Sequence, residues 1–218
     1  MRIKQCLYIL AATVFVWVPT KAQETKNTAS VDCVNNSPNP WSFSLTADGY
    51  VVPHSEFFIS PTFIADHDWL HLEVRYNDED QQTGSAWIGY NLSVGHRLVL
   101  EATPMIGGIF GNTTGIAPGY EVSVSYKKLS LASSGEYVFD TREPSRSFFY
   151  SWPELTYSPA EWLRVGLVAQ RTKTYHTSLD TQRGFLVGFS HEKFQFTTYI
   201  FNPGWLKPTV VFEAGVNF

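Results

Sequence analysis

The sequence has 218 residues, a formal net charge of −4 and only two cysteines, Cys6 and Cys33. This acidic balance argues against nucleic acid as a partner, and so few cysteines exclude a disulfide framework or a metal site built from thiolates. Aromatic residues reach 16% and charged residues only 17%, and after the first 22 residues no segment has the roughly 20 apolar residues of a transmembrane helix.

The N-terminal segment has the pattern of a secretory signal peptide. Two positive charges precede an apolar run over residues 7–18, and a small-residue pattern ends at Ala22. The run is too short to span a membrane as a helix, so we expect a signal peptide over residues 1–22, cleaved after Ala22. Its removal takes away three basic residues, which moves the formal charge to −7 and leaves Cys33 as the single cysteine.

Residues 23–40 are polar and rich in Asn, Ser and Pro, so we expect a flexible lead. From residue 41 onward, apolar and polar residues alternate in short runs, and successive side chains of a strand point to opposite faces. The last run is the clearest, because Val210, Phe212, Ala214, Val216 and Phe218 share one face. The expected strands are 41–52, 57–65, 69–77, 85–94, 97–106, 118–126, 129–140, 147–157, 162–172, 183–190, 193–201 and 208–218.

This alternation predicts an all-β fold, an antiparallel up-and-down transmembrane β-barrel of about twelve strands. About ten residues is the length that a tilted strand needs to cross a bilayer. Ten strands is the alternative count, because prolines interrupt the first two runs and the run at 147–157. A soluble, exported β-sandwich is the competing interpretation.

Short and long connections alternate between these runs. Short turns are expected at 95–97, 127–128, 158–161 and 191–193, and longer loops at 77–84, 107–118, 140–147, 172–183 and 202–208. Bacterial outer-membrane barrels have short periplasmic turns and longer extracellular loops. Trp41, Trp69, Trp87, Trp152, Trp162 and Trp205 fall near strand ends or loops, where an interfacial aromatic girdle is expected.

With its signal peptide, terminal strand and alternating connections, the chain resembles the small outer-membrane β-barrel proteins of Gram-negative bacteria, and it is similar in size to their narrow monomeric porins. The resemblance covers about residues 41–218. It implies that Phe212, Val216 and Phe218 form the signal read by the barrel-assembly machinery. It also implies contact with outer-membrane lipid and lipopolysaccharide. The acidic balance departs from the basic pores typical of sugar-acid channels.

The polar faces of the predicted strands are expected to line the barrel interior, since a charge facing lipid costs about 2–4 kcal/mol at mid-membrane. The expected pore-lining residues are Glu73, Arg75, Arg97, Glu101, Glu121, Lys127, Glu136, Glu154, Arg164 and Glu213. In an open lumen these charges favour cations or polyhydroxyl solutes. In a closed lumen they form a salt-bridge network that fills the barrel, and residues 23–40 are a candidate plug.

No catalytic constellation emerges from the sequence. His176, Ser178 and Asp180 share one loop, and His71 and Glu73 share one interior face, but neither set has the order of a catalytic triad. We therefore predict no enzyme activity, no cofactor and no metal site. An outer-membrane hydrolase is the third alternative.

The sequence thus predicts three parts: a signal peptide at 1–22, a flexible periplasmic lead or plug at 23–40, and an outer-membrane barrel at 41–218. The expected function is a narrow, passive, monomeric channel for small hydrophilic solutes. The alternative is a closed barrel with a structural or adhesive role.

Overall fold

The computed structural model describes residues 40–53, 55–174, 178–204 and 208–218. The expected signal peptide, nearly all of the expected lead or plug with Cys33, and also His54, His176 and Trp205 lie outside these residues. Within the described ranges, no helix is long and apolar enough to cross a membrane.

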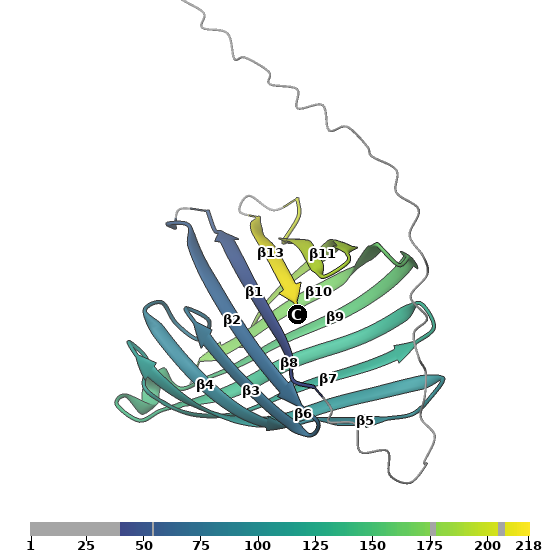
Figure 1. Cartoon of the computed structure of the whole chain (residues 1–218). Coiled ribbons are helices and arrows are strands. Elements are labelled where there is room, and N and C mark those ends of the chain that lie inside the picture. The colour runs from purple at the N-terminus through teal and green to yellow at the C-terminus, as the bar shows by residue number, and fades with distance from the viewer. Residues whose placement is uncertain (1–39, 54, 175–177, 205–207) are drawn as a thin grey trace, which may run out of the picture. The chain divides into compact units, whose positions relative to one another are not determined.

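Nearly every described segment is a strand of one antiparallel sheet (Figure 1). The strands are β1 (Ser42–Val51), β2 (Phe58–His67), β3 (Leu70–Tyr76), β4 (Thr83–Tyr90), β5 (Leu92–Val94), β6 (Leu98–Gly111), β7 (Gly115–Tyr126), β8 (Leu129–Asp140), β9 (Phe148–Ala160), β10 (Leu163–Thr174), β11 (Asp180–His191), β12 (Phe194–Phe201) and β13 (Thr209–Asn217). One short 3-10 helix, η1 (Pro144–Arg146), lies between β8 and β9.

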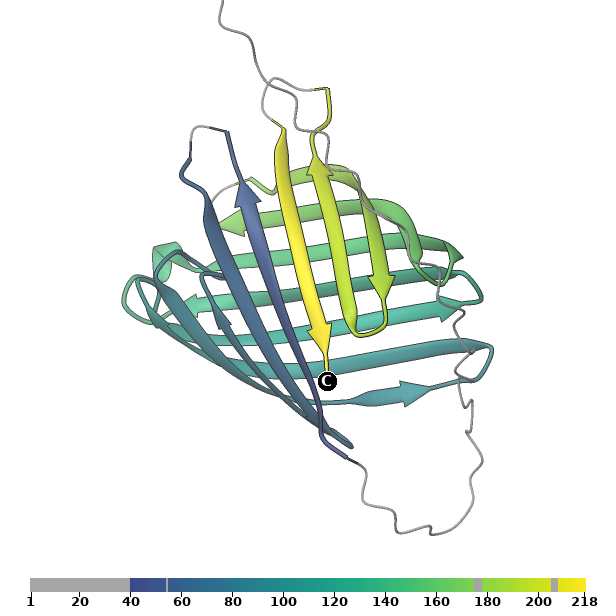
Figure 2. The ribbon, with the colours of Figure 1, turned by 45° about the horizontal axis from the view of Figure 1, so that its top comes forward.

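The sheet closes on itself as a twelve-strand barrel. β1 pairs with β13, as Figure 2 shows, and β4 pairs with β6 from Thr83–Gly111 to Gly89–Met105. β5 pairs with the other end of β6, so β4 and β5 are one spanning strand interrupted at Asn91. The predicted twelve-strand barrel is therefore confirmed, and the two strands that the ten-strand alternative omitted are present as β1 and β2.

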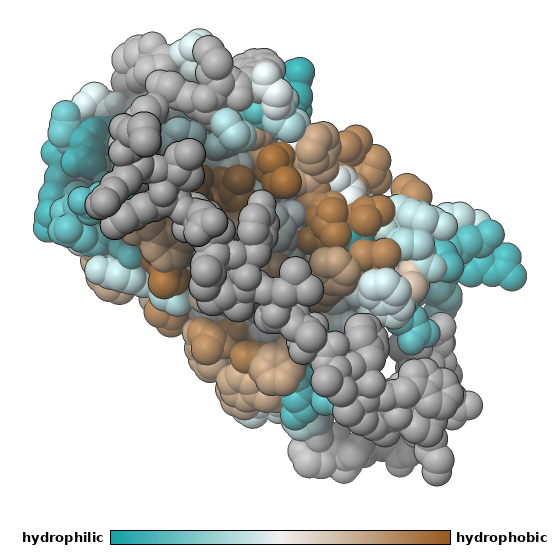
Figure 3. Space-filling model, turned by 90° about the horizontal axis from the view of Figure 1, so that it is seen from above, coloured by the Kyte–Doolittle hydropathy of each residue, from teal (hydrophilic) through white to brown (hydrophobic). Residues whose placement is uncertain are grey.

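Alternate residues along each strand face opposite sides of this wall. Exposed large apolar side chains, such as Leu100, Leu167 and Phe212, cover the outside. Residues at the alternate positions of the same strands, such as Glu101, Arg164 and Glu213, line interior cavities. Figure 3 shows hydrophobic residues in the middle of the visible face, between hydrophilic residues at opposite ends. A barrel with an apolar belt outside and polar groups inside is the arrangement of a membrane-spanning barrel.

The two ends of the barrel differ in their connections. One end, the short-turn end, holds tight turns such as the Asp68 and Lys127 turns, whose first residues have φ near +52° and +55°. Both described ends of the barrel wall, Ser42 and Asn217, also lie at this end, because β1 and β13 are antiparallel and Ser44 pairs with Asn217. The opposite end, the loop end, carries connections such as 77–82 and 141–147.

The expected long loop at 107–118 is wrong, because β6 continues to Gly111 and β7 begins at Gly115. The reason lies in Trp87, which is buried inside the barrel. A Cβ atom on Gly107 would come within 2.4 Å of the Trp87 ring, and one on Gly119 within 2.8 Å. These glycines make room for an indole inside a strand wall instead of forming a turn.

The expected aromatic girdle is only partly present. Trp41, Trp69 and Trp162 are exposed near the short-turn end, and each stacks on another ring, such as Trp69 on Tyr90 at 5.4 Å. Trp87 and Trp152 instead point inward, so assigning them to the girdle is wrong. Both lie at the alternate positions of their strands whose side chains face the barrel interior. This alternation, and not nearness to a strand end in the sequence, sets the direction of the two indoles.

Candidate lumen

Three cavities follow one another through the barrel. The inner cavity, of about 790 Å³, opens toward the short-turn end and is lined by Asp68 and Ser93, among others. The middle cavity is about 240 Å³ and the outer cavity, which reaches Asn77 at the loop end, is about 220 Å³. The open volume inside the barrel is therefore largest near the short-turn end.

Adjacent cavities share lining residues, so they border one another along the barrel interior. The inner and middle cavities share a set of residues that we call the throat: Thr46, Glu121, Ser134, Trp152, Glu154, Tyr199 and Glu213. The middle and outer cavities share Tyr50, Asp78 and Tyr150. The lining combines carboxylates, hydroxyls and aromatic rings.

An ion-pair network around Arg75 borders the middle cavity. The Arg75 guanidinium donates to Glu73 on its own strand, with Nε to Oε1 at 2.7 Å, and to Glu136 on β8, with Nη1 to Oε2 at 3.0 Å. It also contacts Asp78 at 3.2 Å and lies over the Trp87 ring at 4.6 Å. Because Glu73 and Glu136 are almost fully buried, the guanidinium supplies the charge that makes their burial tolerable.

His71 continues this network toward the short-turn end. Its Nδ1 lies 2.8 Å from Asp66, and its Nε2 lies 3.3 Å from Glu73. Asn91, at the break between β4 and β5, donates to the same Asp66 oxygen at 2.7 Å. Both ring nitrogens of His71 are thus held by carboxylates.

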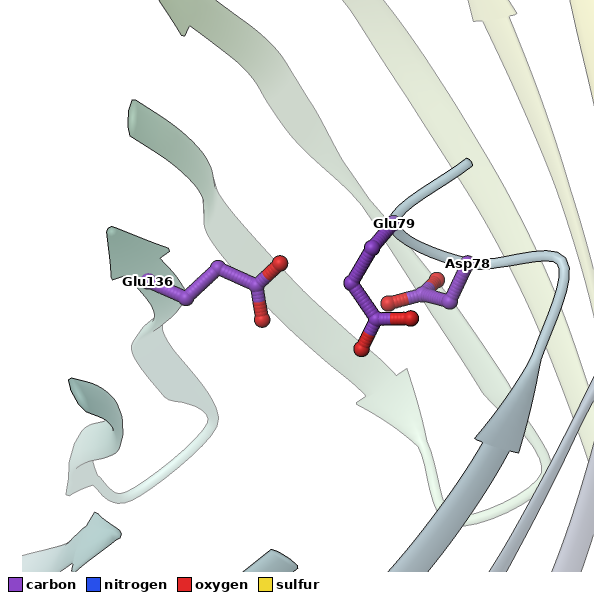
Figure 4. Close-up of side chains that lie close together, drawn as sticks. All are labelled: Asp78, Glu79 and Glu136. Carbon is purple, nitrogen blue, oxygen red and sulfur yellow. The ribbon is translucent and has the colours of Figure 1, made fainter. Parts of the chain in front are cut away.

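Three carboxylates meet near the loop end of the barrel. Oxygens of Asp78, Glu79 and Glu136 lie within 4.8 Å of one another (Figure 4). Burial and the nearby Asp78 raise the pKa of Glu79, whose Oε1 accepts a hydrogen bond from Ser85. Carboxylates are the ligands that Ca²⁺ and Mg²⁺ prefer, but Arg75 already pairs with Asp78 and Glu136, so we interpret the set as part of the ion-pair network.

A second polar network lies on the opposite wall. The Glu213 carboxylate accepts hydrogen bonds from Thr197 and Tyr199, both at 3.0 Å, and Arg164 lies 3.4 Å from it. Arg164 also donates to the Thr197 hydroxyl at 2.8 Å. Glu154 accepts a hydrogen bond from the Trp152 indole at 2.8 Å. These groups come from two pairs of neighbouring strands, β9 with β10 and β12 with β13, and β11 lies between the two pairs.

Two apolar clusters explain the narrowing toward the loop end. One contains Trp87, Met105, Ile109, Ala117 and Val138 on β4, β6, β7 and β8. The other contains Val168, Leu186, Tyr199, Phe201 and Val211 on β10 to β13, with Trp152 and Tyr50 packed against it. Their side chains fill interior space that stays open near the short-turn end.

Eight of the residues expected to line the pore border the inner or middle cavity. They are Glu73, Arg75, Glu101, Glu121, Glu136, Glu154, Arg164 and Glu213. Arg97 and Lys127 are not brought to these cavities. Arg97 is exposed in the turn before β6, and Lys127 turns back over the Tyr126 ring at 5.3 Å. Strand alternation ends where a turn begins, so it does not orient these two side chains.

Several lining groups were not predicted from the sequence. On β1, Asp48 and Tyr50 face the interior at every second position after Thr46. On β2, Asp66 does so after Ile64. Extending the alternation through these two weaker runs would have found them. Tyr150 lies shortly before Pro153 on β9, and this proline interrupts the pattern that would have shown Tyr150 to face inward.

Comparison with known proteins agrees with this architecture. No protein-family model and no curated protein matches the sequence. Among solved structures, the KdgM porin superposes with a TM-score of 0.57 at 12% identity, covering 80% of this chain and 99% of that chain. The KdgM porin in complex with disordered oligogalacturonate gives a TM-score of 0.55, also at 12% identity, covering 80% and 98%. The fold is therefore the closed β-barrel of outer-membrane porins.

Proposed function

We propose that this protein is an outer-membrane channel through which small hydrophilic solutes diffuse passively. The observation that carries the proposal is the series of adjoining inner, middle and outer cavities, which follow one another from the short-turn end to the loop end. Polar and charged groups line this space, as passage of water-soluble molecules requires. Its narrow outer part restricts passage to small solutes.

The membrane assignment follows from the outer surface. Exposed apolar side chains cover the wall, and a strand can satisfy its backbone in lipid only within a closed barrel. The short-turn end is then periplasmic and the loop end extracellular. The proposal includes export through the signal peptide at 1–22, insertion by the barrel-assembly machinery, and lipid and lipopolysaccharide around a monomer.

Phe218, part of the proposed assembly signal, contributes to closure of the wall. It exchanges two backbone hydrogen bonds with Phe43, both at 2.9 Å, and their rings stack at 5.9 Å. Phe212 faces outward and stacks on Phe196. This placement leaves these side chains accessible from the outside.

A closed structural barrel is the second candidate, favoured by the Arg75–Glu136 ion pair and by the two apolar clusters. The third candidate, a hydrolase, would need a nucleophile beside His71, whose ring nitrogens both face carboxylates.

Planar-bilayer recording of the refolded mature chain tests the proposal. We expect discrete conductance steps from protein that shows heat-modifiable migration on a gel, which reports a folded barrel. Folded, heat-modifiable protein without steps would overturn the channel and favour the closed barrel. Swelling of liposomes with sugars of increasing size then measures the size limit.

Oligogalacturonate, present in the KdgM complex, is not the solute that we propose here. It is a polycarboxylate, and the interior of this barrel is rich in carboxylates of its own. Like charges in a narrow passage repel, so an acidic oligosaccharide is disfavoured.

A further inference from the structure

Charges in the described part of the lumen are strongly unbalanced. Ten acidic residues line the three cavities, against two basic ones, Arg75 and Arg164. We infer that the channel prefers positively charged solutes, such as inorganic cations and small molecules with an ammonium or guanidinium group, and that Glu121 and Glu154 at the throat set this preference. This inference rests on the proposed channel function.

Neither arginine offers a free positive charge to a passing anion. Arg75 pairs with Glu73, Asp78 and Glu136, so three carboxylates surround one guanidinium. Arg164 lies against Glu213, at 3.4 Å. Each basic group is matched or outnumbered by the acidic groups beside it, and the remaining carboxylates determine the sign of the potential.

Glu121 and Glu154 are the throat carboxylates without a basic partner. Among the described residues, Glu121 makes no hydrogen bond or ion pair, and the hydrogen-bond donors beside Glu154, the Trp152 indole and the Tyr199 hydroxyl, are neutral. The third throat carboxylate, Glu213, is the one paired with Arg164. Two carboxylates without an ion pair therefore stand where the inner cavity meets the middle cavity, and Arg75 and Arg164 act on them only at longer range.

The position of these two charges makes them effective. A narrow passage with low-dielectric walls concentrates the field of its charges, and rings of acidic side chains select cations in other channels. The throat also contains the aromatic rings of Trp152 and Tyr199, which suit organic cations through cation–π attraction. A carboxylate-bearing solute meets repulsion at the same point.

The test is the zero-current potential of single channels under a KCl gradient. For the wild type we expect a potential of the sign that reports cation preference. The double variant Glu121→Gln/Glu154→Gln should lower the cation-to-anion permeability ratio by about twofold or more. Glu143→Gln is the matched control, because Glu143 is exposed in the 141–147 loop and lines none of the three cavities, and its ratio should match the wild type.

The outcomes separate this inference from the channel proposal. Absence of conductance steps in folded wild-type protein defeats the channel itself. The inference alone is defeated if the wild-type channel prefers anions. It is also defeated if the double variant leaves the cation-to-anion permeability ratio unchanged. If the double variant does not fold, the two single variants replace it, since each should lower the ratio by a smaller amount. When the arginine cation replaces K⁺ in the salt gradient, the wild-type channel should still prefer the cation over chloride.

Discussion

The Arg75 guanidinium on β3 pairs with the Glu136 carboxylate on β8, with Nη1 and Oε2 3.0 Å apart. These strands are separated in the sheet by β4, β6 and β7. The contact therefore joins distant parts of the wall through the interior. It lies beside the middle cavity, so the same pair affects both the stability of the barrel and the width of the passage.

Replacing Arg75 by Met should destabilise the barrel strongly. The change leaves Glu136, only 4% exposed, without its counter-charge, and leaves Glu73, only 3% exposed, with His71 alone. Removal of one partner from a buried ion pair costs about 3–5 kcal/mol. The loss of stability is measured as the free energy of unfolding in urea, with heat-modifiable migration on a gel reporting the folded fraction.

The matched control for Arg75 is Arg146→Met. Arg146 pairs with Asp80 at 3.2 Å, but its side chain is 47% exposed. An exposed pair contributes about 0–1 kcal/mol, so this variant should unfold nearly like the wild type. Equal losses in the two variants would contradict the structural role assigned to the Arg75 network.

Gly107→Ala and Gly108→Ala should differ although the two glycines are adjacent. A Cβ on Gly107 would lie 2.4 Å from the rigid Trp87 ring, whereas a Cβ on Gly108 meets nothing within 4 Å. Overpacking typically costs about 1–3 kcal/mol, so Gly107→Ala should lower the free energy of unfolding and Gly108→Ala should leave it nearly unchanged. Similar values for both would argue against Trp87 packing on Gly107.

This glycine pair shows where sequence reasoning succeeded and failed. Period-two alternation predicts facing well, because lipid penalises every charge on the outer side of a strand; Glu101 beside Leu100 is an example. It does not reveal which interior side chains meet. The contact of Gly107 with Trp87 and that of Arg75 with Glu136 depend on register and curvature, so no local pattern encodes them.

Leu167→Arg should impair assembly far more than Ser134→Arg. Both residues lie near the middle of their strands, but Leu167 is 59% exposed on the outer face, whereas Ser134 lines the throat. Arginine facing the membrane midplane costs about 2–4 kcal/mol. The heat-modifiable fraction after refolding into lipid vesicles measures assembly. If both substitutions were tolerated equally, the assignment of Leu167 to the lipid-facing side and of Ser134 to the interior would be wrong.

The loop at 77–82 should loosen as the pH rises. Glu79 lies in this loop against Asp78, Glu136 and Arg75, and among the described residues its Oε2 is buried without a hydrogen-bond partner. Burial and Asp78 raise the pKa of Glu79 above its ordinary value of 4.5. A raised pKa in the docked state means that docking is fully stabilised below pH 4.5 and loses this contribution as the pH rises through the raised pKa.

Hydrogen exchange of the 77–82 loop, corrected for the intrinsic pH dependence of amide exchange, measures this effect. In the wild type, protection should fall from acidic to neutral pH. In Glu79→Gln the amide stays neutral and can still accept the hydrogen bond from Ser85, so protection should be nearly independent of pH. Protection that rises with pH in the wild type would mean that the Glu79 carboxylate is docked in its ionised form, held by Arg75 more strongly than it is repelled by Asp78 and Glu136.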